Sequence, residues 1–220
     1  AQNNPLCQQM AVQTRLLEKL LDFVDMKEDQ SHIKARSYAL YAISSIVRSN
    51  QEVRMHFESR LNGLGVLLNI LCHQLPDGVM DGNRCESART DEQENKKSFH
   101  YWWRKLIIRS VFLFRKLCDE SEKASDFFYQ KHVITHISSQ LSTTQDQEIR
   151  EHLLLALKSF LLSLNRTRQV ESIKLAPGLR GIIERVNQSS LQESDDEYDM
   201  SDTRSSCKEL LDLIESVLTE

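Results

Sequence analysis

Histidine and cysteine are the residues of this sequence that can bind a metal ion or take part in catalysis. His132 and His136 lie four positions apart, so on a helix both rings share a face and can hold a metal ion. No Glu follows His132, however, and the H-E-x-x-H pattern of zinc peptidases is therefore absent. The 5 Cys residues show no C-x-x-C spacing, which argues against a zinc site and a disulfide framework. We therefore expect no metal site.

Patterns for catalysis and nucleotide binding are also missing. The glycine clusters at 62–65 and 177–181 lack the spacing of a phosphate-binding loop and are typical of helix ends. No nucleophile and base stand at a workable spacing, so we expect a protein that is not an enzyme and uses no cofactor. The formal net charge of -4 argues against nucleic acid as a partner. No apolar run approaches the roughly 18 residues that span a bilayer, so we expect no membrane partner.

Helices must position whatever residues carry the function, because only 6 Gly and 3 Pro interrupt the 220 residues. Residues 32–48 place apolar side chains at i, i+3 and i+4, which predicts a helix with one buried stripe. Residues 104–118 and 149–162 are apolar nearly all round, as expected for helices packed between neighbours in a stack. The stripe predicted for the first helix consists of Ala35, Tyr38, Ala39, Ala42, Ile43, Ile46 and Val47.

These three segments open a repeated pattern in which a polar break, a short helix and a second apolar helix follow. The cores of the second and third segments are offset by about 43 residues, within the roughly 40–47 residues of HEAT and armadillo repeats. The first offset is longer because a polar, charged segment intervenes. We therefore predict an all-α fold, an armadillo-repeat right-handed superhelix with a C-terminal covering helix.

Composition divides the chain into five parts. Residues 1–75 and 99–188 are predicted armadillo repeats, the first of them truncated, and residues 76–98 are predicted to be a disordered insertion. The acidic residues concentrated in 189–204 predict a solvated linker. Helical spacing returns in 205–220, and this helix is expected to cover the exposed end of the stack.

Several motifs of the chain occur in the same order in a known family. They are Ala1–Pro5 followed by Gln8-Gln9, the segment KARSYALYAISSIVR, the turn Leu61–Leu64, and Pro177-Gly178-Leu179. In these residues the chain resembles the armadillo-type nucleotide exchange factors of the seventy-kilodalton heat-shock chaperones, which have cytosolic and endoplasmic-reticulum branches. The resemblance covers nearly the whole chain apart from 76–98. It implies a curved solenoid whose concave face holds the chaperone's nucleotide-binding domain and promotes ADP release.

In armadillo arrays the third helix of each repeat lines the groove. The repeat alignment places three pairs of residues there, each pair four positions apart on one helix face, and neighbouring side chains add charges of both signs. Mixed charge favours a protein partner over a polyanion. The apolar members of the pairs, Phe112 and Leu155, can alternatively belong to the core between repeats. The predicted partner-binding residues are Tyr41, Ser45, Arg48, Phe112, Arg115, Lys116, Asp119, Glu151, Lys158 and Ser159.

Three alternatives stay open at the level of sequence. A general armadillo scaffold that holds an extended peptide in the same groove is the alternative to a chaperone partner. Residues 101–104, Tyr-Trp-Trp-Arg, either form an exposed anchor for a partner, or their two Trp side chains are buried and pack the start of the central helix against its neighbour, which we call a buried pin. We expect a monomer in the cytoplasm, with the endoplasmic reticulum lumen as the alternative because N-x-S/T acceptor tripeptides begin at Asn165 and Asn187.

Overall fold

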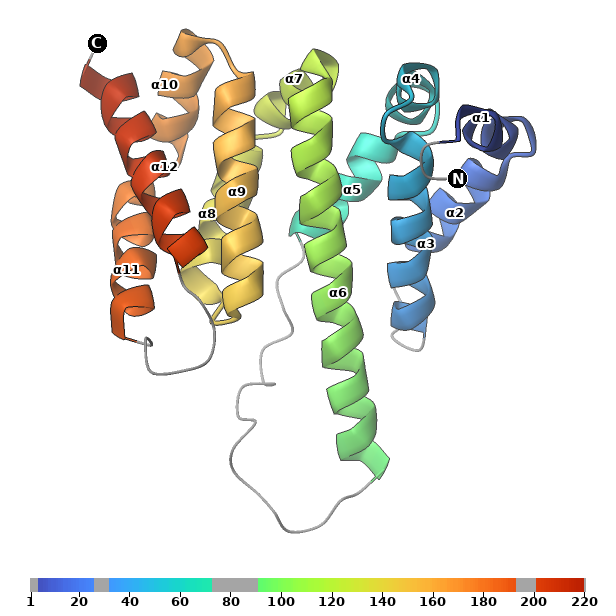
Figure 1. Ribbon diagram of the computed structural model, residues 1–220, viewed down its shortest axis with the longest axis horizontal. Helices are drawn as coiled ribbons and strands as arrows, with labels where there is room; N and C mark the ends of the chain where they lie inside the picture. Colours follow the sequence, from blue (N-terminus) through green and yellow to red (C-terminus); the bar gives the residue numbers. More distant parts are fainter. Residues whose placement is uncertain (1–3, 26–31, 73–90, 193–200, 220) are drawn as a thin grey trace. The chain divides into compact units, whose positions relative to one another are not determined.

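The computed structural model describes residues 4–25, 32–72, 91–192 and 201–219. These residues form twelve helices and no strand, which confirms the predicted all-α class (Figure 1). They divide into two compact units, residues 1–110 and 111–220, and helix α6 belongs to both.

The helices follow one another as four triplets, each with two shorter helices and then a longer one. The first triplet is α1 (Pro5–Gln13), α2 (Leu16–Asp25) and α3 (Ile33–Val47), and the second is α4 (Gln51–Ser59), α5 (Gly63–Cys72) and α6 (Asp91–Glu120). The third is α7 (Glu122–Gln130), α8 (Val133–Thr143) and α9 (Gln147–Ser163), and the fourth is α10 (Arg166–Leu175), α11 (Leu179–Gln192) and α12 (Ser201–Thr219).

Three boundaries differ from the sequence predictions. Helix α6 begins at Asp91, within the predicted insertion 76–98, and α11 and α12 extend into the predicted linker 189–204. Charged residues are good helix formers, so a polar composition alone did not separate a solvated helix end from a loop. The remainder of both predictions falls on residues 73–90 and 193–200, which lie outside the described residues.

Helix α1 was absent from the sequence predictions, because its apolar residues follow no amphipathic period. Its signal is local instead. The side chain of Asn4 accepts a hydrogen bond from the backbone N–H of Cys7 at 3.1 Å, and Pro5 supplies a preset φ in the first turn. The same kind of cap starts other described helices, where the capping residues are Asn50, Ser121, Asp146 and Asn165.

Equivalent helices of consecutive triplets pack against each other within each unit. In the first unit α1 contacts α4 and α2 contacts α5; in the second, α8 contacts α11 and α9 contacts α12 (Figure 1). The first helices of the last two triplets are linked as well, because Arg168 of α10 pairs with Asp126 of α7. Each unit therefore stacks one triplet on another in register.

A buried glutamine fastens α1 to the turn between α3 and α4. The Gln8 side chain is 1% exposed, and its amide donates to the carbonyl oxygens of Ser45 at 3.2 Å and Arg48 at 3.0 Å. Its own oxygen accepts a hydrogen bond from Asn50 Nδ2 at 3.1 Å. Because the last carbonyls of a helix lack intrahelical partners, Gln8 supplies the missing donors for α3.

Aromatic rings from three helices form the centre of the second unit. Phe114 of α6 lies edge-on to Phe128 of α7, with ring centroids 4.7 Å apart, and 6.0 Å from Phe160 of α9. All three rings are fully buried. Burial of this kind stabilises a protein by about 1.5–3 kcal/mol per side chain, so these rings hold α7 and α9 against α6.

The buried stripe predicted for the helix at 32–48 is wrong at two positions. Ala35 is exposed and Tyr38 is 51% exposed, whereas Arg36 and Leu40 are buried. Arg36 is tolerated inside because its Nε donates to the carbonyl oxygen of Val24 at 3.0 Å. The stripe is thus rotated toward Arg36, which brings Tyr38 to the surface.

Candidate protein-binding surface

The third helix of each triplet presents a face that is not buried by the rest of its unit. On α3 this face carries Lys34, Tyr38, Tyr41 and Ser45, and the C-cap residue Arg48 continues the same spacing of three and four residues. All five side chains are exposed or half-buried. The face therefore holds polar and aromatic groups that the packing of the first unit leaves accessible.

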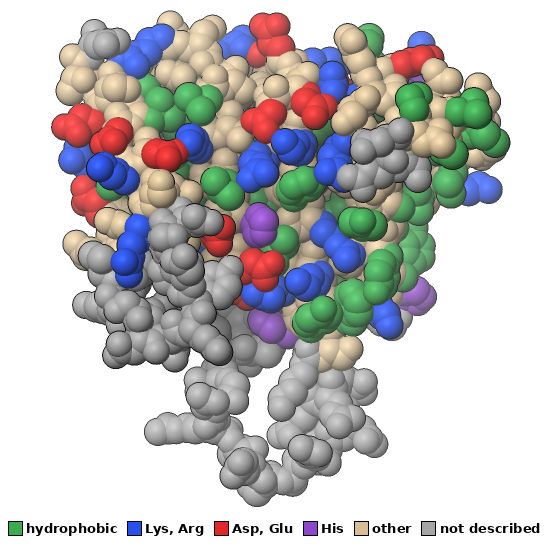
Figure 2. Space-filling model, viewed as in Figure 1, with side chains coloured by type: hydrophobic (Ala, Val, Ile, Leu, Met, Phe, Trp, Pro, Cys, Tyr) green, Lys and Arg blue, Asp and Glu red, His purple; other side chains and the backbone are tan. Residues whose placement is uncertain are grey.

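Across from this face, the part of α6 in the first unit contributes further aromatic and basic side chains. Tyr101 is 49% exposed, and Trp102, Lys105 and Arg109 are half-buried. Figure 2 shows hydrophobic and basic side chains gathered over α3 and the neighbouring length of α6. We call the set the aromatic–cation patch; it consists of Lys34, Tyr38, Tyr41, Tyr101, Trp102, Lys105 and Arg109.

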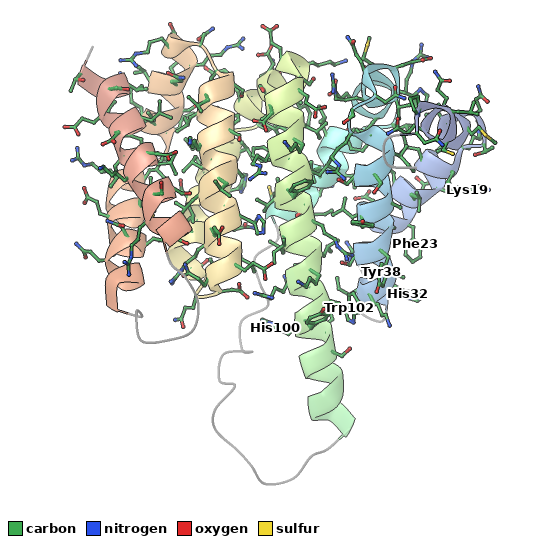
Figure 3. All side chains as sticks on the ribbon, in the orientation of Figure 1. Lys19, Phe23, His32, Tyr38, His100 and Trp102 are labelled. Atoms are coloured by element: carbon green, nitrogen blue, oxygen red, sulfur yellow. The ribbon has the colours of Figure 1, made fainter. Side chains whose placement is uncertain are left out.

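Ring contacts link the two helices of the patch. Tyr38 and Trp102 face each other from α3 and α6, with centroids 5.3 Å apart (Figure 3). Tyr101 lies edge-on to Trp102 at 5.0 Å, and the Lys34 ammonium group is 5.2 Å from the Trp102 ring centroid. Such geometries are attractive for aromatic pairs and for cations over rings, so the rings are held in place before any partner binds.

Arg109 joins the other end of the patch to α3. Its Nη1 donates to the carbonyl oxygen of Ser37 at 2.7 Å and to the Ser37 hydroxyl at 2.8 Å. The guanidinium carbon lies 5.3 Å from the Tyr38 ring centroid and 5.2 Å from that of Tyr41. One cation is therefore fixed between two exposed tyrosines.

Both interpretations of residues 101–104 apply, each to a different side chain. Trp103 is buried at 8% exposure and stacks on Phe99 with centroids 6.1 Å apart, as expected for a buried pin. Tyr101 and Trp102 belong to the surface patch instead. Neighbouring residues on a helix point about 100° apart, so Trp103 turns toward the interior while Tyr101 and Trp102 stay accessible.

The structure places the three predicted residues of the first unit on the accessible face of α3. Tyr41 is 53% exposed, and Ser45 and Arg48 are half-buried. The Ser45 hydroxyl donates to the carbonyl oxygen of Tyr41 at 3.0 Å, and Arg48 Nε donates to that of Ser44 at 3.1 Å. Of these three, Tyr41 belongs to the patch.

The predicted residues of the second unit are all accessible in part. The Arg115 guanidinium lies 5.6 Å from the Phe112 ring centroid, and Lys116 pairs with Asp119 at 3.8 Å between Nζ and Oδ2. Phe112 is half-buried, which fits both the accessible face and the core between repeats. The predicted residues of α9, Glu151, Lys158 and Ser159, are half-buried, and so is Leu155, the apolar member of the pair with Ser159.

Lys158 has a partner on the neighbouring third helix. Its ammonium group pairs with Glu209 of α12. This hydrogen bond and the positive charge hold the pKa of Glu209 below its ordinary value. The ion pair therefore links α9 to α12 within the second unit. It also places charges of both signs on the accessible faces of these two helices.

A separate groove of about 530 Å³ lies on the first unit between α1 and α4. Val12, Met55 and His56 line it, and Gln9 Nε2 donates to Glu52 Oε2 at 3.2 Å across it. None of the predicted partner-binding residues lines this groove. It therefore lies apart from the accessible face of α3.

In the described parts of the chain, no group of three or more His, Cys, Asp or Glu side chains is placed to hold a metal ion. No described helix is both long and apolar enough to cross a bilayer.

A comparison with known protein families found no match to this chain, and a comparison with curated proteins found no significant match either.

Lys34, Tyr38, Lys105 and Arg109 of the patch were not predicted as binding residues, whereas Tyr101 and Trp102 belong to the segment 101–104 that was an exposed anchor in one of its two interpretations. A signal for two of them was present, because Lys34 and Tyr38 continue the spacing of Tyr41 toward the start of the helix. Trp102 and Arg109 could be assigned only once α6 was placed beside α3, since they act through contacts across helices.

Proposed function

We propose that the helix triplets are armadillo repeats and that the accessible faces of their third helices bind the nucleotide-binding domain of a seventy-kilodalton heat-shock chaperone. Bound there, the protein promotes release of ADP from the chaperone. One observation carries the proposal: nine of the ten predicted partner-binding residues lie on third helices, the tenth, Arg48, is the C-cap of α3, and all ten are exposed or half-buried. The in-register packing of consecutive triplets within each unit supports the armadillo assignment.

The mechanism is a difference in affinity between two chaperone states. A protein that binds an open nucleotide-binding domain more tightly than a closed one shifts the chaperone toward the open state. A thousandfold acceleration of ADP release requires the barrier to fall by about 4 kcal/mol. Surfaces of ordinary size supply this amount when a few well-packed aromatic and arginine side chains anchor them.

The alternative function, a scaffold for an extended peptide, needs side-chain donors for the carbonyl groups of the peptide backbone. Ser45 occupies one of the expected positions, but its hydroxyl already donates to the carbonyl oxygen of Tyr41. This leaves the hydroxyl oxygen as an acceptor only. We therefore favour a folded chaperone domain as the partner.

Stopped-flow release of a fluorescent ADP analogue from the chaperone tests the proposal. Saturating protein is expected to accelerate release, and Lys116→Glu to weaken the effect, since Lys116 lies on the accessible face of α6. Lys131→Glu is the matched control, because Lys131 is exposed at the end of α7 and the change in charge is the same. An unchanged release rate at saturating protein would overturn the exchange proposal. Altered peptide preference with no chaperone binding would favour the scaffold.

A further inference from the structure

From the geometry of the aromatic–cation patch we infer that it is a docking surface for an acidic segment of a partner protein. The inference deepens the proposed function and rests on it in one respect only, namely that the chaperone is the protein that carries this acidic segment. All seven residues of the patch lie in the first unit.

Charge is sharply segregated at the patch. In the first unit, residues 33–47 and 98–110 contain no Asp or Glu, although the whole chain has 32 acidic residues against 28 Lys and Arg. In the described parts of the chain, no carboxylate forms an ion pair with Lys34 or Arg109. A positive surface on a protein of net charge -4 is complementary to carboxylates of a partner.

Arg109 is positioned so that part of its hydrogen-bonding capacity remains. Nη1 is used by Ser37, and the described residues provide no hydrogen-bond acceptor for Nε or Nη2. A guanidinium group in this state can donate two parallel hydrogen bonds to one carboxylate. The rings of Tyr38 and Tyr41 hold it in place, so little side-chain freedom is lost on binding.

The aromatic members provide contact area around the charges. Tyr38, Tyr41 and Tyr101 are each about half exposed, and Tyr, Trp and Arg are the residue types that contribute most at protein interfaces. Their mutual contacts fix the rings before binding. The patch therefore combines rigid apolar contacts with two cations, Lys34 and Arg109, that pair with no carboxylate of the described residues, which fits a segment carrying carboxylates beside apolar side chains.

A protein segment fits the patch better than single-stranded nucleic acid does. Binding of nucleic acid needs open ring faces on which bases stack, together with an extended basic track. Trp102 is only half-buried, but Tyr38, Tyr101 and the Lys34 ammonium group already surround its ring. The ring is therefore committed to contacts within the unit.

Fluorescence of Trp102 provides a readout confined to the patch. The chain has 2 Trp, so Trp103→Phe leaves Trp102 as the single emitter and removes a buried indole N–H that has no hydrogen-bond partner. The probes are a helical peptide with Glu on one face and Leu on the other, and the same peptide with Gln for Glu. We expect the Glu peptide to change the emission of Trp102 and the Gln peptide to bind at least about tenfold more weakly.

Charge reversal supplies the matched pair of variants. Lys34→Glu is expected to weaken binding of the Glu peptide at least about tenfold, because like charges then face each other. Lys174→Glu makes the same change at an exposed position of α10 in the second unit and should leave affinity within about twofold. Should Trp103→Phe fail to fold, isothermal titration calorimetry compares the two charge variants in the wild-type background.

The outcomes separate this inference from the proposed function. Any of three results would overturn the docking surface. The two peptides would bind equally well, the two charge variants would lose the same affinity, or a thymidine oligonucleotide would bind more tightly than the Glu peptide. Specific binding of the Glu peptide without any effect on ADP release refutes the exchange function and supports the docking surface. Accelerated ADP release that Lys34→Glu leaves unchanged, together with unchanged peptide binding, refutes the docking surface alone.

Discussion

Replacing Gln8 by Glu tests whether one buried amide holds the first unit together. Gln8 donates two hydrogen bonds to carbonyl oxygens at the end of α3 and accepts one from Asn50. A carboxylate keeps the bond from Asn50 but turns its second oxygen toward the two carbonyl oxygens, which then lack donors. Each buried polar group left unpaired costs about 1–3 kcal/mol, so we expect Gln8→Glu to lower the free energy of unfolding by about 3 kcal/mol near neutral pH.

The pH dependence of this loss identifies its cause. Burial and the two facing carbonyl oxygens disfavour the charged form, so the pKa of the introduced carboxyl in the folded state rises above the ordinary value of about 4.3. When protonated, the carboxyl can again donate to one carbonyl oxygen. The part of the cost that comes from ionisation is therefore absent below the unfolded-state pKa, and it develops as pH rises through the higher folded-state pKa.

Urea unfolding at about pH 4 and about pH 7, followed by tryptophan fluorescence, measures the effect. Both Trp residues, Trp102 and Trp103, belong to the first unit, so the signal reports on the part of the chain that contains Gln8. Gln13→Glu, at an exposed position of the same helix, is the control and should change stability by less than about 0.5 kcal/mol. A cost for Gln8→Glu that is equally small, or one that is the same at both pH values, would refute the reasoning.

Three further predictions follow from local contacts. A Cβ at Gly63 would lie 2.4 Å from Cε2 of the buried Phe57 ring, so Gly63→Ala should destabilise the protein by about 1–3 kcal/mol, and by less in a Phe57→Leu background, as measured by urea unfolding. Lys158→Ala should raise the pKa of Glu209 in an NMR titration; because the pair lowers that pKa, its stabilisation is present above the unfolded-state pKa and is lost as pH falls through the folded-state value. Burial raises the pKa of Cys207 to about 11, so iodoacetamide should modify this thiol only on unfolding, as detected by mass spectrometry.

Controls for these predictions lie in the same chain. A Cβ at Gly181 would meet only Arg185 Nη1 at 3.8 Å, so Gly181→Ala should not be destabilising through a clash. Cys7 is exposed and should react with iodoacetamide in the folded protein. Equal costs for the two glycine variants, or equal reaction rates for Cys7 and Cys207, would contradict the corresponding argument.

Sequence periodicity determined the helical class and most helix positions. The short helices predicted after the polar breaks that follow 32–48 and 104–118 are present as α4 and α7, because polar breaks and capping residues are local signals. Helix α1 shows the limit of the approach. It has no amphipathic period, and a long-range contact of Gln8 with the end of α3 contributes to holding it in place.

The candidate surface was likewise predictable from the sequence only in part. Spacing by three and four residues was sufficient to place Tyr41 and Ser45 on one accessible face, because both lie on a single helix. Tertiary structure decided that Tyr38 lies outside the core and that Trp102 and Arg109 complete the patch. The physical reason is that burial and pairing depend on which neighbouring helix covers a face, and that information is distributed over residues as distant as Ser37 and Arg109.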